Sequence, residues 1–258
     1  MKGIFRPYNE ESFWVNAGIA AFWVALALVL WFFPPSFFYF IPAPQAVLDK
    51  YKFLYEFGLL DDVLVSLKVI FWASLYALPI GAILSYLYET PFFKPPVIMV
   101  ASLSNLGPAA VIAACLYMGF SGLEVKVWTM TFVILVYFLS ALLQNRPSKS
   151  DLDFAWTMNM GAWQSLWHVT IRGRLYDTLK AFIPNVAMGW AMLSVVEGAS
   201  RSDGGLGDVL LKQDKISSMA GIAAVSFIAL AFGLLIRFGS RFALDWALPA
   251  TADQEVGG

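Results

Sequence analysis

Long apolar stretches constrain the fold of this chain more than any other feature of its sequence. A helix needs about 20 mostly apolar residues to cross the hydrocarbon core of a bilayer. Stretches of this kind occur at Val15–Phe33, Val63–Leu87, Val97–Tyr117, Val127–Leu143, Leu179–Val196 and Met219–Ile236. They are continuously apolar, whereas the strands of a membrane barrel alternate apolar and polar residues. The sequence therefore predicts an all-α, polytopic membrane helix bundle with about six transmembrane helices.

Composition supports a membrane protein and excludes several functions. Of the 258 residues, 59% are hydrophobic and only 14% are charged, whereas soluble domains carry about a quarter charged residues. The net charge of −1 argues against a nucleic-acid partner, because binding to phosphates requires a basic surface. The single cysteine, Cys115, cannot form an intrachain disulfide, and its apolar surroundings predict a packed core residue.

No catalytic motif accompanies the polar residues of the chain. The only histidine, His168, has no nucleophile motif near it and is expected to be a polar residue at the membrane interface. The sequence contains no metal-ligand cluster and no GxxxxGK[ST] phosphate loop. We therefore expect no cofactor, no metal and no enzymatic activity in this chain.

Lysine and arginine set the expected orientation. More of them fall on the N-terminal side of the membrane than on the other side, which by the positive-inside rule places both termini in the cytoplasm. We expect one transmembrane domain over residues 15–247, preceded by a cytoplasmic segment at 1–14 and followed by a cytoplasmic tail at 248–258. The longest cytoplasmic loop then lies at 146–176.

That loop contains a segment, Asp151–Leu175, that is rich in tryptophan and interrupted by polar residues. The Ser and Asp residues at its start are typical helix caps, and the pattern predicts one or two short helices broken near Gly161. Arg172, Gly173 and Arg174 supply a helix stop and positive charge. Two interpretations follow: an interfacial helix with its tryptophans at headgroup level, or a helix that docks on a cytoplasmic partner.

The same segment resembles the EAA coupling motif of bacterial ABC importer permeases, in which Glu-Ala-Ala is followed by a glycine and, further on, by Leu-Pro. The alignment runs through Trp163, His168 and Ile171. In this alignment Asp153-Phe154-Ala155 takes the place of Glu-Ala-Ala. Asn159 takes the place of the glycine, with Gly161 two residues later, and Ile171-Arg172 takes the place of Leu-Pro.

Three further segments are similar, in order, to permeases of the nitrate/sulfonate/taurine branch. They are the third-helix segment Ser102–Phe120, the loop FSGLEVK at Phe120–Lys126, and VEGASRSDGGLGDVLL at Val196–Leu211. The likeness extends from about Leu64 to Trp246. The chain therefore resembles a permease subunit of a binding-protein-dependent ABC importer, with a type I-like fold.

The resemblance implies a set of partners and a location. Separate cytoplasmic ATPase subunits supply the energy, and a periplasmic or lipid-anchored substrate-binding protein delivers a small solute of the nitrate, sulfonate, taurine or bicarbonate type. A second permease subunit completes a homodimer in the lipid of the bacterial inner membrane. In the family, the helix with the EAA motif enters a groove on the ATPase. By this likeness the coupling residues are Asp153, Phe154, Ala155, Trp156, Asn159, Gly161 and Trp163.

The family resemblance also places the translocation path along the third and fifth helices of two permease subunits. The residues concerned are Ser102, Ser104, Asn105, Pro108, Pro184, Asn185 and Glu197. The structural alternative is that Ser and Asn repair backbone breaks at the prolines, with Pro184-Asn185 breaking the fifth helix. Glu197, beside Arg201 and Asp203, is expected to be an exposed loop charge rather than an outer gate. Gly204, Gly205 and Gly207 are interpreted as turn formers.

An ion-coupled secondary transporter is the alternative function. Such proteins usually contain internal repeats or acidic groups near the middle of the membrane. No internal repeat is found, and Glu197 and Asp245 lie at helix ends.

Overall fold

The computed structural model describes residues 13–32, 42–145, 153, 155–200 and 204–247, and within them the fold is entirely helical, with no strand. The all-α prediction is thus confirmed. Most of the predicted terminal segments, residues 146–152 of the predicted loop, and Phe154 lie outside the described residues. The helices are α1 (Phe13–Phe32), α2 (Pro44–Glu56), α3 (Leu59–Leu87), α4 (Lys94–Ser102), α5 (Pro108–Tyr117), α6 (Leu123–Gln144), α8 (Ala162–Ser165), α9 (Leu175–Ala199), α10 (Leu206–Lys215) and α11 (Met219–Ala247).

Four of the described helices, α3, α6, α9 and α11, are long and apolar enough to cross a membrane. A fifth span is formed if α4 and α5 count as one, but these two helices meet at a bend of 112°. The first predicted stretch forms α1, whose apolar part is Gly18–Phe32. Whether α1 provides a sixth span stays a prediction.

The third predicted stretch, Val97–Tyr117, forms two helices rather than one. A 3₁₀ turn at Leu103–Asn105 follows α4, and the chain then becomes extended at Leu106 and Gly107 before Pro108 begins α5. Proline has no N–H to continue a helical ladder, and it disfavours the helical conformation in the residue before it. Gly107 accordingly has a ψ of 149°, outside the helical region.

The centre of the bundle is α6. In its most apolar stretch of 18 residues, 67% is buried, against 17–33% in the corresponding stretches of α3, α9 and α11. Two glycines allow neighbouring helices to approach it closely. A Cβ atom at Gly81 of α3 would lie 2.6 Å from Cδ1 of Phe138, and one at Gly189 of α9 would lie 2.7 Å from Cγ1 of Ile134. Small residues at such crossings are the usual means of close helix packing in membranes.

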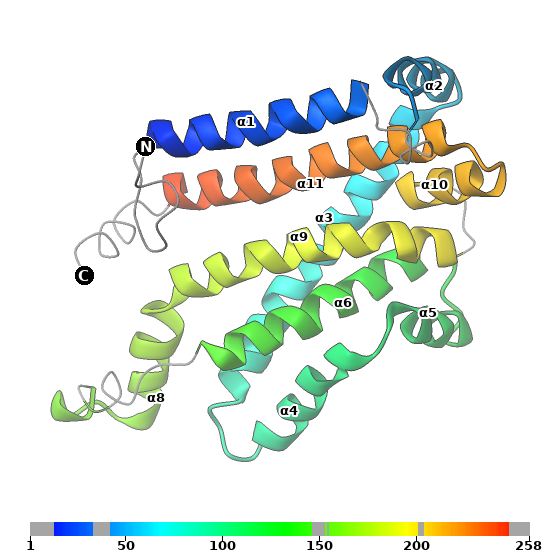
Figure 1. The fold of residues 1–258 in the computed structure, drawn as a ribbon. Coiled ribbons are helices and arrows are strands. Elements are labelled where there is room, and N and C mark those ends of the chain that lie inside the picture. The colour runs from blue at the N-terminus through cyan, green and yellow to red at the C-terminus, as the bar shows by residue number, and fades with distance from the viewer. Residues whose placement is uncertain (1–12, 33–41, 146–152, 154, 201–203, 248–258) are drawn as a thin grey trace.

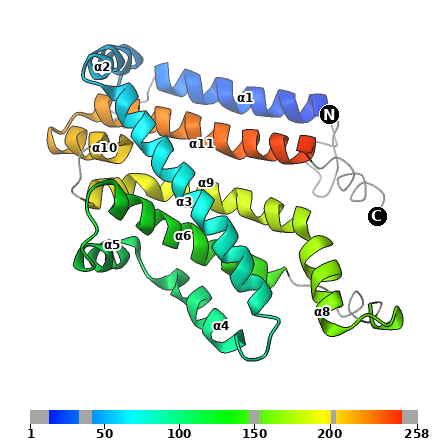
Figure 2. The ribbon, with the colours of Figure 1, turned by 180° about the vertical axis from the view of Figure 1, so that it is seen from behind.

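The two ends of the bundle carry different elements. Figure 1 shows α1, α11, α9 and α6 side by side, and the view from behind in Figure 2 shows α3 crossing them. One end, called here the α8 end, carries α8 and the turn between α3 and α4. The other, the α10 end, carries α2, α5 and α10. There Tyr51 of α2 donates a 2.9 Å hydrogen bond to the carbonyl of Ala224, and burial raises the pKa of its hydroxyl.

Candidate functional site

The tryptophan segment, defined here as residues 153–172, forms two short helical pieces at the α8 end. The first piece, around Ala155–Thr157, ends because Asn159 takes a left-handed conformation with φ of 55°. The N–H of Asn159 donates to the carbonyl of Trp156, and that of Met160 donates to the carbonyl of Ala155. A left-handed residue directly after a helix is a common way of ending it.

Gly161 separates the two pieces, as predicted. It directly precedes α8 in an extended conformation, and its N–H donates to Oε1 of Gln164 at 3.1 Å. After α8 the chain continues as a π-helix over Leu166–Arg172. Gly173 ends this helix, and a Cβ atom there would lie 2.8 Å from the carbonyl oxygen of Val169. A glycine is therefore needed for the backbone to pass so close.

The tryptophan segment exposes most of its large apolar side chains. Trp156, Trp163 and Trp167 are 66%, 76% and 57% exposed, whereas Ala155 is only 1% exposed. The charged Asp153 is also exposed. Exposed aromatic side chains gathered on one segment are typical of a surface that contacts lipid or another protein.

Arg174 attaches this segment to the bundle. Its Nη1 donates to the carbonyl of Asn145 at 2.8 Å, which links the start of α9 to the end of α6. Its Nε lies 3.4 Å from Oδ2 of Asp177 in an ion pair one turn along. The tryptophan segment is thus continuous with α9 and fixed to α6 at the same point.

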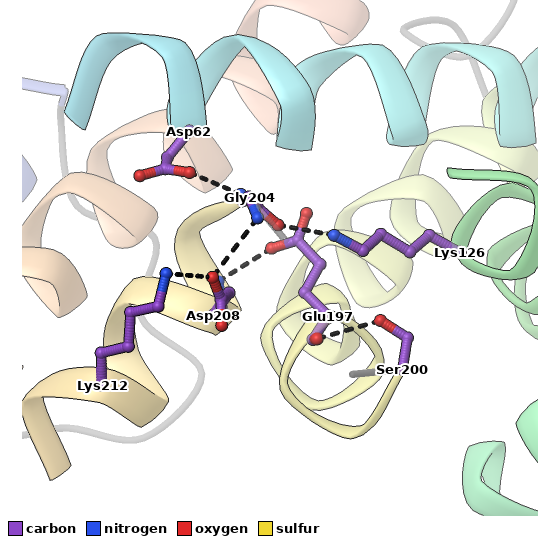
Figure 3. A network of polar contacts seen from close by, with 9 residues as sticks. Asp62, Lys126, Glu197, Ser200, Gly204, Asp208 and Lys212 are labelled. Atoms are coloured by element: carbon purple, nitrogen blue, oxygen red, sulfur yellow. Dashed lines mark hydrogen bonds and ion pairs between the residues drawn. The ribbon is translucent and has the colours of Figure 1, made fainter. Parts of the chain in front are cut away.

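At the α10 end lies a buried polar cluster, centred on Glu197 (Figure 3). Glu197 is only 1% exposed. Oγ of Ser66 lies 2.8 and 3.0 Å from its two carboxylate oxygens, and the N–H of Gly207 donates to it at 2.8 Å. Its carboxylate therefore joins α3, α9 and α10.

The expectation that Glu197 is an exposed loop charge is wrong. The helix α9 continues past it to Ala199, and α3 and α10 cover the side chain. Its predicted neighbours Arg201 and Asp203 lie outside the described residues.

Further side chains hold the turn before α10 in place. Lys126 of α6 is 1% exposed, and its Nζ donates to the carbonyl of Gly204 at 2.5 Å. Asp62 accepts a 2.9 Å hydrogen bond from the N–H of Gly205, and Ser66 accepts one from the N–H of Leu206. Helix starts leave N–H groups without intrahelical partners. Here side chains of α3 and α9 supply those partners. We call Asp62, Ser66, Lys126, Glu197 and Gly204–Gly207 the Glu197 cluster.

Gly204 and Gly205 are turn formers, as interpreted from the sequence, whereas Gly207 lies inside α10 and corrects that interpretation. Gly205 also makes room for the carboxylate, and Gly207 makes room for the backbone of α9. Gly204 and Gly205 have φ values of 86° and 102°, which side chains rarely adopt. A Cβ atom at Gly205 would lie 2.4 Å from Oε1 of Glu197. A Cβ atom at Gly207 would lie 2.3 Å from the carbonyl oxygen of Ser194.

The predicted path residues near the bend of α4 and α5 bond to local backbone. Ser102 donates through Oγ to the carbonyl of Ile98 at 2.8 Å, and Asn105 donates to the carbonyl of Ser102 at 3.3 Å. Ser104 lies half-buried in the 3₁₀ turn, and Pro108 begins α5. Both hydrogen bonds stay within about one turn of the chain, at the break between α4 and α5.

Pro184 and Asn185 do not break the fifth helix, which corrects the sequence-based expectation. The helix α9 runs through both residues from Leu175 to Ala199. Nδ2 of Asn185 donates to the carbonyl of Ala181 at 2.7 Å, beside the point where the proline cannot donate. The tryptophan segment and Glu197 are therefore connected by one uninterrupted helix of 25 residues.

Asn159 provides a prediction at the tryptophan segment. Replacing it by glycine is expected to leave the segment intact, because glycine adopts positive φ without strain. Replacing it by valine is expected to cost about 1–3 kcal/mol locally, because a β-branched residue there is strained. Limited proteolysis of the purified protein checks this. We expect faster cleavage around residues 153–163 in Asn159→Val than in wild type or Asn159→Gly, and equal rates in all three would contradict the conformation described.

No protein-family model matches this sequence, and no curated protein matches it. Among solved structures, a chain of the MetNI methionine ABC transporter in inward-facing conformations is similar, with a TM-score of 0.56 and 16% sequence identity. The match covers 75% of this chain and 96% of that chain. At this identity the likeness concerns the fold. The chain thus shares the all-helical fold of that chain of a methionine ABC transporter.

Proposed function

We propose that this chain is the permease subunit of an ABC importer and forms the path by which a small solute crosses the bilayer. One observation carries the proposal: the fold is that of a chain of a methionine ABC transporter. The tryptophan-rich helical segment exposed at one end gives it further support. The sequence contains no GxxxxGK[ST] loop, so the energy would come from separate ATPase subunits.

In this proposal the tryptophan segment is the docking site for the ATPase. Trp156 and Trp163 are already exposed, so they can enter a partner's groove without leaving the core of this chain. Buried tryptophans are among the strongest contributors to protein interfaces. The left-handed Asn159 supports the alignment with the coupling motif, because it occupies the position of the motif glycine and adopts a conformation that glycine favours.

The remaining partners follow from the same proposal. A periplasmic or lipid-anchored binding protein would deliver the solute at the α10 end, and two copies of the permease would enclose the path in the inner membrane, with both termini cytoplasmic. The nitrate/sulfonate/taurine branch is proposed from sequence alone, on the segments Ser102–Phe120, Phe120–Lys126 and Val196–Leu211. The hydrogen bonds of Val196–Leu211 give this segment a structural role in holding α10, and they assign no cargo.

The buried Glu197 is the one observation that favours an ion-coupled secondary transporter instead. Acidic groups inside membrane proteins are often ion sites. However, the carboxylate is hydrogen-bonded by Ser66 and Gly207 and lies in the last turns of α9. A structural role at the helix end explains these contacts without a bound ion.

Affinity purification from membranes of the source organism tests the proposal. The tagged chain should retain an ATPase subunit with a phosphate loop, recognised by mass spectrometry, and a second permease copy. The purified chain alone should hydrolyse no ATP, whereas the retained complex should. Solute uptake that persists after ATP depletion but collapses with the ion gradient would instead establish the secondary transporter.

A further inference from the structure

The described surface contains a furrow between α9 and α11 whose two halves differ in chemistry. The half nearer the α10 end is a groove of about 390 Å³. Its walls are mainly apolar or small and include Trp190, Ala191, Leu230, Gly233 and Leu234. Glu197 lies at the far end of this groove, where Ser66 and Gly207 already bond its carboxylate.

The half nearer the α8 end is basic. A hollow of about 250 Å³ is lined there by Lys180 of α9 and by Arg237 and Arg241 of α11, together with Tyr176, Ile183, Pro184 and Leu244. No acidic side chain is among the described residues that line it. Arg237 also lines the apolar groove. The groove and the hollow therefore meet at this arginine and form one amphiphilic furrow.

The apolar groove is long enough to hold much of an acyl chain. Its lining residues on α9 extend from Ala187 to Glu197, which at 1.5 Å per residue is about 15 Å. Half of a hydrocarbon core of roughly 30 Å, the depth that one acyl chain covers, is also about 15 Å. The basic hollow lies next to this groove, toward the α8 end.

The positions of the arginines favour an anionic partner. Arg237 directly follows the apolar stretch Met219–Ile236, so its charge lies at the edge of the apolar region, where lipid headgroups begin. Within the described part of the chain, no carboxylate is recorded in an ion pair with Arg237 or Arg241. Basic hollows between transmembrane helices are known to take lipid phosphates.

We propose that the furrow between α9 and α11 binds one anionic phospholipid from the leaflet at the α8 end. Its phosphate contacts Arg237 and Arg241, and an acyl chain occupies the apolar groove beside Trp190 and Leu234. The proposal rests on the membrane-spanning role proposed above. A second copy of the chain fits the furrow less well, because a two-fold interface presents the same patch from both copies and would bring the basic hollows together.

Lipid binding to the purified full-length chain tests the basic half. The delipidated protein in detergent is titrated with phosphatidylglycerol or phosphatidylcholine and examined by native mass spectrometry. We expect a preference for phosphatidylglycerol that falls about 25-fold in R237Q/R241Q, since each interfacial cation contributes roughly a factor of five. The matched control K52Q/K215Q removes two exposed positive charges at the α10 end and should keep the preference.

A pair of substitutions tests the apolar half. Ala191 is exposed and lines the groove, so Ala191→Phe fills it at little cost to folding. Leu235 is exposed on α11 but does not line the groove or the hollow, so Leu235→Phe is the control. We expect weaker phosphatidylglycerol binding in Ala191→Phe and unchanged binding in Leu235→Phe.

Several outcomes would overturn the proposal. One is equal phosphatidylglycerol binding by R237Q/R241Q and wild type. Another is displacement of the lipid by millimolar inorganic phosphate, which would identify a site for free anions. A third is occupation of the furrow by a second copy of the chain, which would be seen as disulfide-linked dimers of Leu230→Cys in a Cys115→Ala background. ATPase copurification is measured on the same preparations. If the ATPase is recovered but no preference for phosphatidylglycerol is found, only the lipid proposal fails. If the preference is found but no ATPase is recovered, only the permease proposal fails.

Discussion

Replacing Glu197 by alanine is expected to lower the free energy of unfolding by about 3–5 kcal/mol, the usual cost of removing one partner from a buried charged network. The substitution deprives Ser66 and the N–H of Gly207 of their acceptor. It also removes the carboxylate that attracts the buried Lys126. Because these contacts join α3, α6, α9 and α10, their loss loosens the whole α10 end.

The single cysteine provides the measurement. Cys115 is buried in the core, so a thiol-reactive dye labels it only as the protein unfolds. Heating the detergent-solubilised protein with the dye should give a clearly lower melting temperature for Glu197→Ala. Glu197→Gln, which keeps an acceptor oxygen, should melt in between, and the exposed Glu124→Ala should melt like wild type. A Glu197→Ala protein that melts like wild type would show that the cluster contributes little.

Replacing Trp163 by glutamate is expected to reduce ATPase association by about 100-fold or more, as the loss of a tryptophan anchor does at many interfaces. In the isolated chain Trp163 is exposed, so the substitution removes little packing within this protein. Labelling of Cys115 should therefore give an unchanged melting temperature. The quantity measured is the amount of ATPase recovered with the tagged permease variant from membranes.

Gly161→Glu gives an independent version of the same experiment. A Cβ atom at Gly161 would meet only Oε1 of Gln164, at 3.8 Å, so a side chain fits the folded chain and points to its surface. It should obstruct docking without unfolding the segment. Tyr117→Glu is the matched control, since Tyr117 is an exposed aromatic residue of α5 at the other end of the bundle. Undiminished ATPase recovery with Trp163→Glu and Gly161→Glu would refute a docking role for this segment.

Features that depend on local sequence were predictable. Continuous apolar stretches of sufficient length identify α3, α6, α9 and α11, because in lipid the backbone must satisfy its own hydrogen bonds. The break at Gly161 and the turn at Gly204 and Gly205 were also readable, because glycine favours conformations that other residues avoid.

Features that depend on distant contacts were not predictable. Lys126 lies 78 residues from Gly204, and Ser66 lies 131 residues from Glu197 in the chain. Both were missed, and Glu197 was misplaced at the surface for the same reason. The only available signal was the spacing of Asp62 and Ser66, which places two polar side chains four residues apart on one face of an apolar helix.

Prolines gave opposite results at two sites, and the difference is local. At Pro108 the preceding Gly107 has an extended backbone, and the chain turns. At Pro184 the helix continues, and Asn185 bonds to the carbonyl of Ala181. A proline in an apolar stretch thus indicates a missing hydrogen bond, and the neighbouring residues decide whether the helix bends sharply or persists.

The persistence of α9 through Pro184 has a mechanical consequence. A helix of 25 residues is about 37 Å long. Pivoting such a rod by about 10° around its midpoint carries its two tips in opposite directions by roughly 3 Å each, a shift comparable to the whole length of a hydrogen bond. A force applied at the start of α9, where Arg174 ties the helix to α6, would therefore displace the carboxylate near the opposite tip by a distance large enough to exchange its hydrogen-bond partners.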